Sequence, residues 1–157
     1  MIRPNTTCLG NHGHNSRQWR SLLAATVTEF TSQTKQPSDT RTLMRRVGIR
    51  FAAQTPLPSC KTLEEFEEAI RNVWQEMDLG WVTLEESGRT LKITHHCSAN
   101  GILLDNAFGE STPLLAPSFL EGVYQKWLSN MGAGEALHVR QVSEPDQFNS
   151  IEYALSL

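Results

Sequence analysis

Apolar residues recur at helical spacing in three segments of the first half of the chain. The first covers residues 17–34 and the second about residues 40–54, and Pro37 separates them. Thr62 and Glu65 form a capping box, in which each side chain bonds a free backbone amide, so they predict the start of a third helix. The apolar positions expected to face a core are Trp19, Leu22, Leu23, Val27, Phe30, Leu43, Met44, Val47, Phe51, Leu63, Phe66, Ile70, Val73, Trp74 and Met77.

In the second half the spacing changes to short runs of β-branched and apolar residues. Residues 81–86 and 90–95 flank a Ser-Gly-Arg turn and predict a β-hairpin, and residues 135–142 and 149–157 predict a second one. Helices before and between antiparallel hairpins predict a single-domain α+β fold, with helices packed on a small antiparallel sheet. We expect the open edges of such a sheet to be covered by helices or paired with another copy.

A loop and a fourth helix are expected between the two hairpins. Residues 97–113 lack a clear period and predict the loop. Pro117 suits a first helical turn, and Ser118 with Glu121 matches a second capping box, so we expect the helix to begin here. Its apolar positions are Phe119, Val123, Trp127 and Leu128.

The composition is that of an ordinary globular domain. Of the 157 residues, 39% are hydrophobic and 20% are charged, which suffices to bury one core without a metal or disulfide. Residues 1–15 are rich in turn formers and predict a flexible N-terminal arm, so the domain is expected to span residues 16–157. The cysteines Cys8, Cys60 and Cys97 are odd in number and widely spaced, which favours reduced thiols.

Charge and hydropathy limit the partners. A net charge of −3 gives no basic face for a phosphate backbone, so we expect no nucleic-acid partner. No run approaches the about 18–20 apolar residues that span a bilayer, and the N-terminus lacks the apolar core of a signal peptide. We therefore expect no direct membrane insertion and a cytoplasmic location.

Candidate chemistry is sparse. Cys8, His12 and His14 are ligand types that zinc prefers, but structural sites use four ligands, so we expect a polar arm without metal. The run over residues 95–97 offers two imidazoles and a thiol. Consecutive strand residues face opposite sides, however, and no oxyanion signal follows, which favours a locally hydrogen-bonded His95. With no phosphate loop or nucleophile elbow, we expect neither an enzyme nor a cofactor.

Some aromatic and glycine residues are candidates for packing or assembly. The tryptophans on apolar helix stripes are Trp19, Trp74 and Trp127. That placement favours a core or a subunit interface over a sugar-binding surface, whereas Trp81 is the least committed. Gly48 would let another backbone or an aromatic ring approach its helix, and Gly122 would allow close helix packing between subunits or within one. The candidate assembly or packing residues are Gly48, Trp81, Gly122, Tyr124 and Trp127.

Four segments are more distinctive than the rest. They are LMRRVGIRFA (residues 43–52), LGWVTLE (79–85), LKITHH (91–96) and LLAPSFLEGVYQKWLSNMGAG (114–134). From about Leu43 to the C-terminus the sequence resembles the D-subunit family encoded in bacterial cellulose synthase operons. LAP with LEGVYQKW is the strongest match, and none of the segments is a reaction motif.

The resemblance implies a non-catalytic accessory subunit that forms a ring-like octamer, a tetramer of dimers, and helps nascent glucan chains to order or crystallise. The implied partners are further copies, subunits of the cellulose synthase complex or another accessory protein of the operon, and nascent β-1,4-glucan. We expect the protein near the inner membrane on the cytoplasmic side, held there by the complex, with the periplasm as the alternative. The resemblance assigns no residue to glucan contact.

Two other functions stay open. A small-ligand-binding sensor domain with a 4-vinyl-reductase-like fold also has helices followed by hairpins and a long C-terminal helix, and it would need an apolar pocket. A thiol or histidine hydrolase would use His95 and Cys97, and replacing either residue would then abolish turnover.

Overall fold

The computed structural model describes residues 22, 25–33, 36–77, 79–96, 112–148 and 150–157. Residues 25–33 are helical, and Leu22 and Phe30, which were expected to face the core, are instead 57% and 54% exposed. The elements that follow in chain order are α2 (Pro37–Gln54), α3 (Leu63–Glu76), β1 (Trp81–Ser87), β2 (Thr90–His96), α5 (Thr112–Asn130), β3 (His138–Gln141) and β4 (Ile151–Ser156). This order confirms the expected α+β class.

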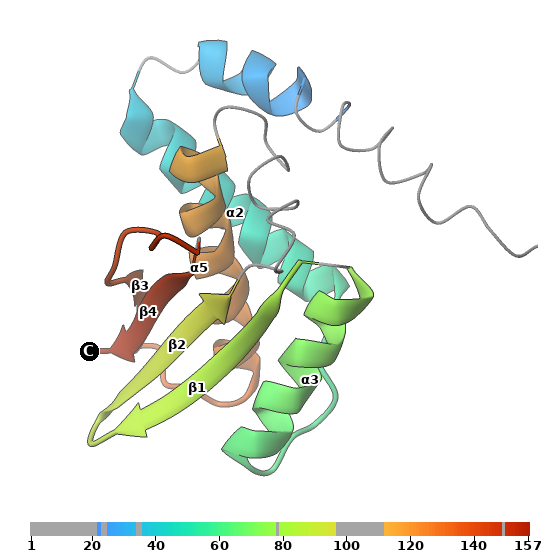
Figure 1. Cartoon of the computed structure of the whole chain (residues 1–157), viewed down its shortest axis with the longest axis vertical. Coiled ribbons are helices and arrows are strands. Elements are labelled where there is room, and N and C mark those ends of the chain that lie inside the picture. Colours follow the sequence, from blue (N-terminus) through green and yellow to red (C-terminus); the bar gives the residue numbers. More distant parts are fainter. Residues whose placement is uncertain (1–21, 23–24, 34–35, 78, 97–111, 149) are drawn as a thin grey trace, which may run out of the picture.

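The two hairpins form one antiparallel sheet with the strand order β1–β2–β4–β3 (Figure 1). Strands β2 and β4 join them in a register that pairs Ile93 with Tyr153 and His95 with Ile151. Because side chains alternate along a strand, these residues and Val82 share one face of the sheet, and all of them are buried. The core therefore lies on this face.

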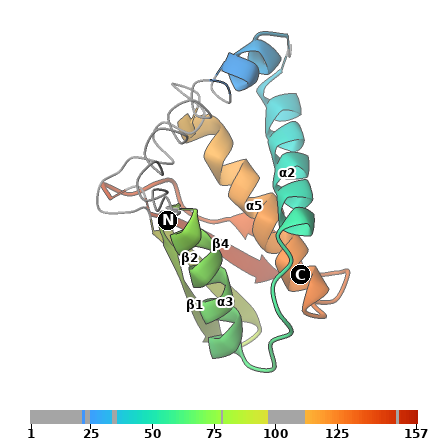
Figure 2. The same ribbon diagram turned by 90° about the vertical axis from the view of Figure 1, so that its right-hand side faces the viewer.

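Helices α3 and α5 cover the buried face of the sheet, and α2 packs on the far side of α5 (Figure 2). α3 lies against β1, whereas α5 meets β4 through a hydrogen bond from the Tyr153 hydroxyl to the Pro117 carbonyl (3.0 Å). With neighbours on both sides, α5 is buried along most of its length. Its most enclosed side chains are Leu115, Leu120, Val123, Tyr124 and Trp127.

The predicted start of α3 at Thr62 is confirmed, although the Glu65 carboxylate bonds the amide of Lys61 and not that of Thr62. The Glu65 backbone amide donates to Thr62 Oγ1 (3.2 Å), and the Glu65 carboxylate accepts from the backbone amide of Lys61 (2.7 Å). The apolar stripe of this helix then faces the sheet, and its buried members are Phe66, Ala69, Ile70 and Trp74. The local signal and the packing thus agree for α3.

Helix α5 begins before Pro117 and contains it, so the prediction that Pro117 starts the helix was wrong. The second capping box is also not formed, because Ser118 lies inside the helix and the Glu121 carboxylate instead pairs with Arg45 (3.4 Å). An interior proline removes one helical hydrogen bond, and burial of the preceding turn offsets this loss. The buried side chains of that turn are Leu115 and Ala116. Of the expected loop over residues 97–113, the first part lies outside the described residues and the end belongs to α5.

Helix α2 buries a different face from the one that its large apolar residues predicted. The buried residues of the helix are Thr40, Met44, Gly48 and Ala52. Val47, which was expected in the core, is 43% exposed, and Leu43 and Phe51 are only half-buried. Met44 was expected in the core and is buried, whereas the other buried residues are small, and Leu43, Val47 and Phe51 lie beside them.

Two glycines explain this choice of face. A Cβ on Gly48 would lie 2.0 Å from the carbonyl oxygen of Phe119, and a Cβ on Gly122 would lie 2.0 Å from the carbonyl oxygen of Arg45. Helices α2 and α5 therefore cross with backbone against backbone, which only glycine permits at these positions. Both close approaches join residues of one chain.

Helix side chains cover both edges of the sheet. At the β1 edge, the Glu67 carboxylate of α3 accepts a hydrogen bond from the Leu84 amide (2.7 Å). At the β3 edge, Gln125 and Glu121 of α5 accept from backbone amides of β3 at 2.7 and 3.1 Å. Helix side chains of the same chain thus bond one amide of β1 and two of β3.

Candidate functional site

Aromatic rings from α2, α3 and α5 pack together over the sheet. Trp74 lies 5.3 Å from Trp127, 5.9 Å from Phe51 and 6.2 Å from Tyr124, measured between ring centroids. The Trp127 indole also donates to the carbonyl of Thr55, at the end of α2 (2.9 Å). Tyr124 and Trp127, two of the candidate packing or assembly residues, thus lie in the core of one chain.

A hydrogen-bonded series of side chains runs through this cluster. Trp74 Nε1 donates to the Tyr124 hydroxyl oxygen (3.1 Å), which lies 2.6 Å from His95 Nδ1. Which of these two groups donates depends on the tautomer of the imidazole. His95 Nε2 is buried without a hydrogen-bond partner among the described residues. Burial lowers the pKa of His95 to about 3, although the backbone of Leu79 acts in the opposite direction.

His95 and His96 face opposite sides of the sheet, as strand alternation predicted. His95 is fully buried. His96 lies on the outer face, where Thr83 Oγ1 is 3.1 Å from Nε2 and Ser150 Oγ is 3.3 Å from Nδ1. Cys97 lies outside the described residues. The described part of the chain gives the hydrolase hypothesis no support.

Trp81 lies on the outer face of the sheet. Its ring stacks on His96 with a centroid distance of 3.9 Å and an interplanar angle of 18°, and the residue keeps 41% of its surface exposed. Burial lowers the pKa of His96, which favours the neutral imidazole beneath the indole. A held, partly exposed aromatic ring is a surface on which another flat group can stack.

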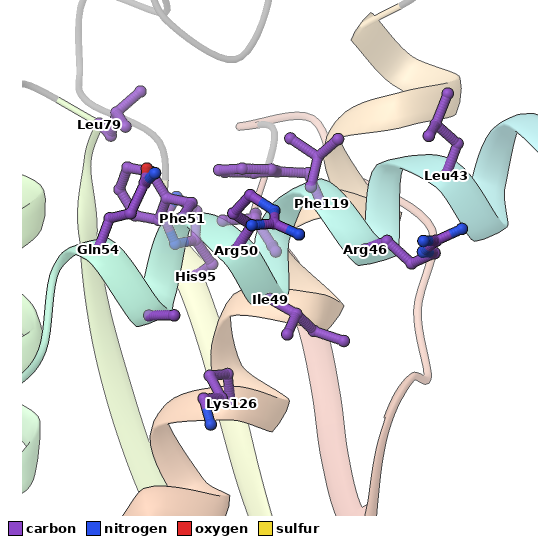
Figure 3. Close-up of a pocket in the computed structure, with 13 residues that line it drawn as sticks. Leu43, Arg46, Ile49, Arg50, Phe51, Gln54, Leu79, His95, Phe119 and Lys126 are labelled. Carbon is purple, nitrogen blue, oxygen red and sulfur yellow. The ribbon is translucent and has the colours of Figure 1, made fainter.

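A groove of about 1010 Å³ follows the exposed side of α2 (Figure 3). Its main apolar lining residues are Leu43, Val47, Phe51, Leu79, Phe119 and Leu120. Arg46 and Arg50 project from the outer side of α2 (Figure 3). Lys126 of α5 lies on the opposite side of α2 from Phe119 (Figure 3). The buried His95 ring forms part of the inner wall. The groove thus combines an apolar lining with a basic rim.

A second pocket of about 440 Å³, lined by residues of α2, α5 and β3, is polar. Arg41, Arg45 and Arg140 line it together with Glu121 and Glu144. Arg45 is already paired with Glu121 at 3.4 Å. Because both signs of charge are present, this pocket lacks the uniformly basic character of an anion site.

The predicted residues that lie outside the described part of the chain are Cys8, His12, His14, Trp19, Leu23 and Cys97. Within the described part, no group of three or more His, Cys, Asp or Glu side chains is placed to hold a metal ion. None of the helices formed by the described residues has the length and apolar character needed to cross a bilayer. Cys60 is a free thiol whose pKa is raised, mainly by burial.

Sequence reasoning missed the groove and an exposed phenylalanine, Phe148, that is 71% exposed. The groove was missed because Leu43, Val47 and Phe51 fit an ordinary core-facing helix stripe. Phe148 had a usable signal, since it follows the turn sequence Ser-Glu-Pro-Asp, where a core position is unusual.

Comparison with known proteins places this geometry in a fold and a family. The chain is similar, with a TM-score of 0.57, to the crystal structure of a trafficking protein particle complex subunit 3 from Naegleria fowleri. In that structure the subunit is covalently bound to palmitic acid. The match covers 91% of this chain and 96% of that one, and at 15% identity it shows a shared α+β fold alone. None of the curated proteins compared with the chain matches it. The family model of the cellulose synthase D subunit matches residues 6–154, which confirms the sequence resemblance. The chain therefore belongs to that family, which is an accessory and not the catalytic part of cellulose synthesis.

Proposed function

We propose that the chain is a non-catalytic subunit that assembles into a ring-like homo-oligomer, an octamer built as a tetramer of dimers, and helps nascent glucan chains to order. The observation that carries this proposal is the family match over residues 6–154. Assembly into a ring is a role for which the chain needs contact surfaces and no reactive group. The enclosed position of His95 is compatible with that role.

Exposed apolar side chains support assembly. Those on the described surface with 40% exposure or more are Leu22, Phe30, Val47, Trp81, Val142, Phe148 and Leu157. Val142 and Phe148 lie in one connection, between β3 and β4, and Val47 lies on α2, so these positions are available for contacts between copies. Because helix side chains already bond backbone amides at the sheet edges, the proposed contacts between copies use helix faces and loops instead of added strands.

The mass of the protein in solution tests the ring. Eight copies of the 17.6 kDa chain would give a particle of about 140 kDa in multi-angle light scattering. A strain that lacks the gene would then make less ordered cellulose, measured by X-ray diffraction of the product, and the wild-type gene would restore the order. A protein that stays monomeric at high concentration would contradict the proposal.

Trp81 is our candidate for glucan contact, because the indole is held by His96 and partly exposed on the outer face of the sheet. Trp81→Ala is expected to weaken binding of cello-oligosaccharides by roughly three- to tenfold, since a stacked ring contributes that much beyond buried area. Isothermal titration calorimetry measures the change. Trp81→Phe is the control that keeps a ring, and unchanged binding by the alanine variant would place glucan elsewhere.

The proposed partners are subunits of the cellulose synthase complex or another accessory protein of the same operon. The proposed location is the cytoplasm, next to the inner membrane through the complex, and the periplasm is the alternative. Fractionation of cells that carry a tagged copy distinguishes the two compartments. Co-purification with the synthase subunits tests the partner.

A second candidate function is small-ligand binding, which the groove along α2 favours. An apolar chain with an acidic head would suit the apolar lining and the arginines Arg46 and Arg50. The similar trafficking subunit holds its palmitic acid covalently, whereas the described lining of this groove contains no cysteine. Native mass spectrometry of the purified protein would reveal a bound ligand on a monomer or dimer if this function holds.

A further inference from the structure

The connection between β3 and β4 presents an exposed phenylalanine on an ordered turn. The Asp146 carboxylate accepts hydrogen bonds from the backbone amides of Phe148 and Ser150, both at 2.8 Å, and the Asp146 amide donates to the Ser150 carbonyl (3.0 Å). Phe148 is nevertheless 71% exposed, and Val142 at the start of the connection is 58% exposed. A side chain held on a fixed turn loses little further entropy when a partner covers it. We call residues 142–148 the acidic loop, because it also carries Glu144.

The groove along α2 has the complementary character. Its lining is apolar, and Arg46 and Arg50 on its rim form no ion pair with another described residue. A partner with an apolar side chain between acidic ones would bury its apolar group in the groove and place its carboxylates against these cations.

The acidic loop lies on the other side of α2 from the apolar wall of its own groove. Glu144 shares the polar pocket with Arg41 and Arg45, whereas Leu43 and Val47 line the groove. At 100° per residue, the first pair and the second pair project from nearly opposite sides of the helix. The groove and loop of one chain are therefore separate surfaces that different copies can join.

We propose that the acidic loop of one copy binds the α2 groove of a second copy, with Phe148 against the apolar lining and Glu144 and Asp146 facing Arg46 and Arg50. This inference rests on the proposed homo-oligomer and names the contact that builds it. Because two different surfaces meet, the contact is head-to-tail, and repetition closes a ring when the rotation between copies allows. A tetramer of dimers needs one contact of this kind, repeated around the ring.

The first test removes the apolar group. Phe148→Ser is expected to raise the concentration at which the oligomer dissociates by at least about tenfold, because buried aromatic anchors dominate interface energies. Light scattering over a dilution series measures this shift. Phe148→Leu, which keeps an apolar side chain, is the matched control and should dissociate near the wild-type concentration. Both variants should melt at the wild-type temperature of the isolated subunit, since the side chain is exposed.

The second test reverses charges. Arg50→Glu and Glu144→Lys should each weaken assembly, because each places like charges across the contact. The two variants mixed, or both changes in one chain, should restore the wild-type particle, since every groove then meets a loop of opposite charge. Restoration requires Arg50 and Glu144 to face each other between copies, which a general loss of folding would not give.

The outcomes separate this contact from the proposed function. If the wild-type protein is a ring and Phe148→Ser leaves its dissociation unchanged, the loop is not the contact, and the accessory role stands. A wild-type monomer overturns the contact and the ring together. An apolar ligand found in the groove of the intact particle by native mass spectrometry would show that the groove has another occupant, and the inference would fail.

Discussion

Gly122→Ala is expected to destabilise the protein by at least about 3 kcal/mol, at the upper end of the cost of overpacking. The added methyl would lie 2.0 Å from the carbonyl oxygen of Arg45 and 2.9 Å from its carbon, so two helices would have to separate. Side chains cannot rotate away to relieve this contact, because the groups it meets belong to a backbone. Gly48→Ala should behave in the same way against Phe119. Urea unfolding followed by circular dichroism measures both losses.

Gly134→Ala is the matched control, because a Cβ there meets no atom within 4 Å. It is expected to change the free energy of unfolding by less than about 0.5 kcal/mol, as for most surface substitutions. The loss in the Gly122 variant should also be independent of protein concentration, since the contact lies within one chain. A loss that shrinks as concentration rises would instead place Gly122 between subunits.

Local signals in the sequence were sufficient for much of the fold. Thr62 and Glu65 marked the start of α3 because a capping box depends on residues only three apart. The first hairpin was equally local, and its turn uses Gly88 at a positive φ of 62°. Pro117 failed as a boundary because its effect on a helix depends on burial of the preceding turn, which is a tertiary property.

The face of α2 could not be predicted, for a related reason. A hydrophobic stripe identifies large side chains, but the α5 contact selected Gly48 and Ala52 because the two backbones approach so closely. The displaced residues Leu43 and Val47 then formed the groove. The hydrogen bonds from helix side chains to the edge strands could not be predicted either. In the sequence, Glu67 and Gln125 look like ordinary solvated positions, because their backbone partners are distant along the chain.

The buried face of α2 and the bonded sheet edges together change the physical basis of the proposed assembly. Open strand edges were the first reason to expect contacts between copies, and helix side chains now occupy amides at both edges. The proposed assembly instead uses the groove beside α2, where Leu43 and Val47 lie outside the contact with α5. The crossing of α2 and α5 at Gly48 and Gly122 thus affects both the stability of one chain and the surface that we propose for binding the next.

Acidification is expected to destabilise the protein progressively below pH 6.5, and His95 is the main reason. Burial lowers its pKa from 6.5 to about 3, so the folded protein keeps the imidazole neutral while the unfolded chain binds a proton. The contribution of neutral His95 to the free energy of unfolding is therefore fully present above pH 6.5. It falls by about 1.4 kcal/mol for each pH unit as the pH drops toward 3. The loss at pH 4.5 should be roughly 2–3 kcal/mol. His96, whose pKa is also lowered by burial, adds to it in the same direction.

His95→Leu separates this titration from other effects of acid. The variant loses the hydrogen bond with Tyr124 and should be less stable at pH 7, but its free energy of unfolding should fall much less between pH 7 and pH 4.5. Urea unfolding at a series of pH values gives both curves. His138→Gln replaces an exposed histidine on β3 and serves as the control for substitution of a histidine. If His95→Leu kept the full wild-type slope, protonation of the buried imidazole would not be what limits stability in acid.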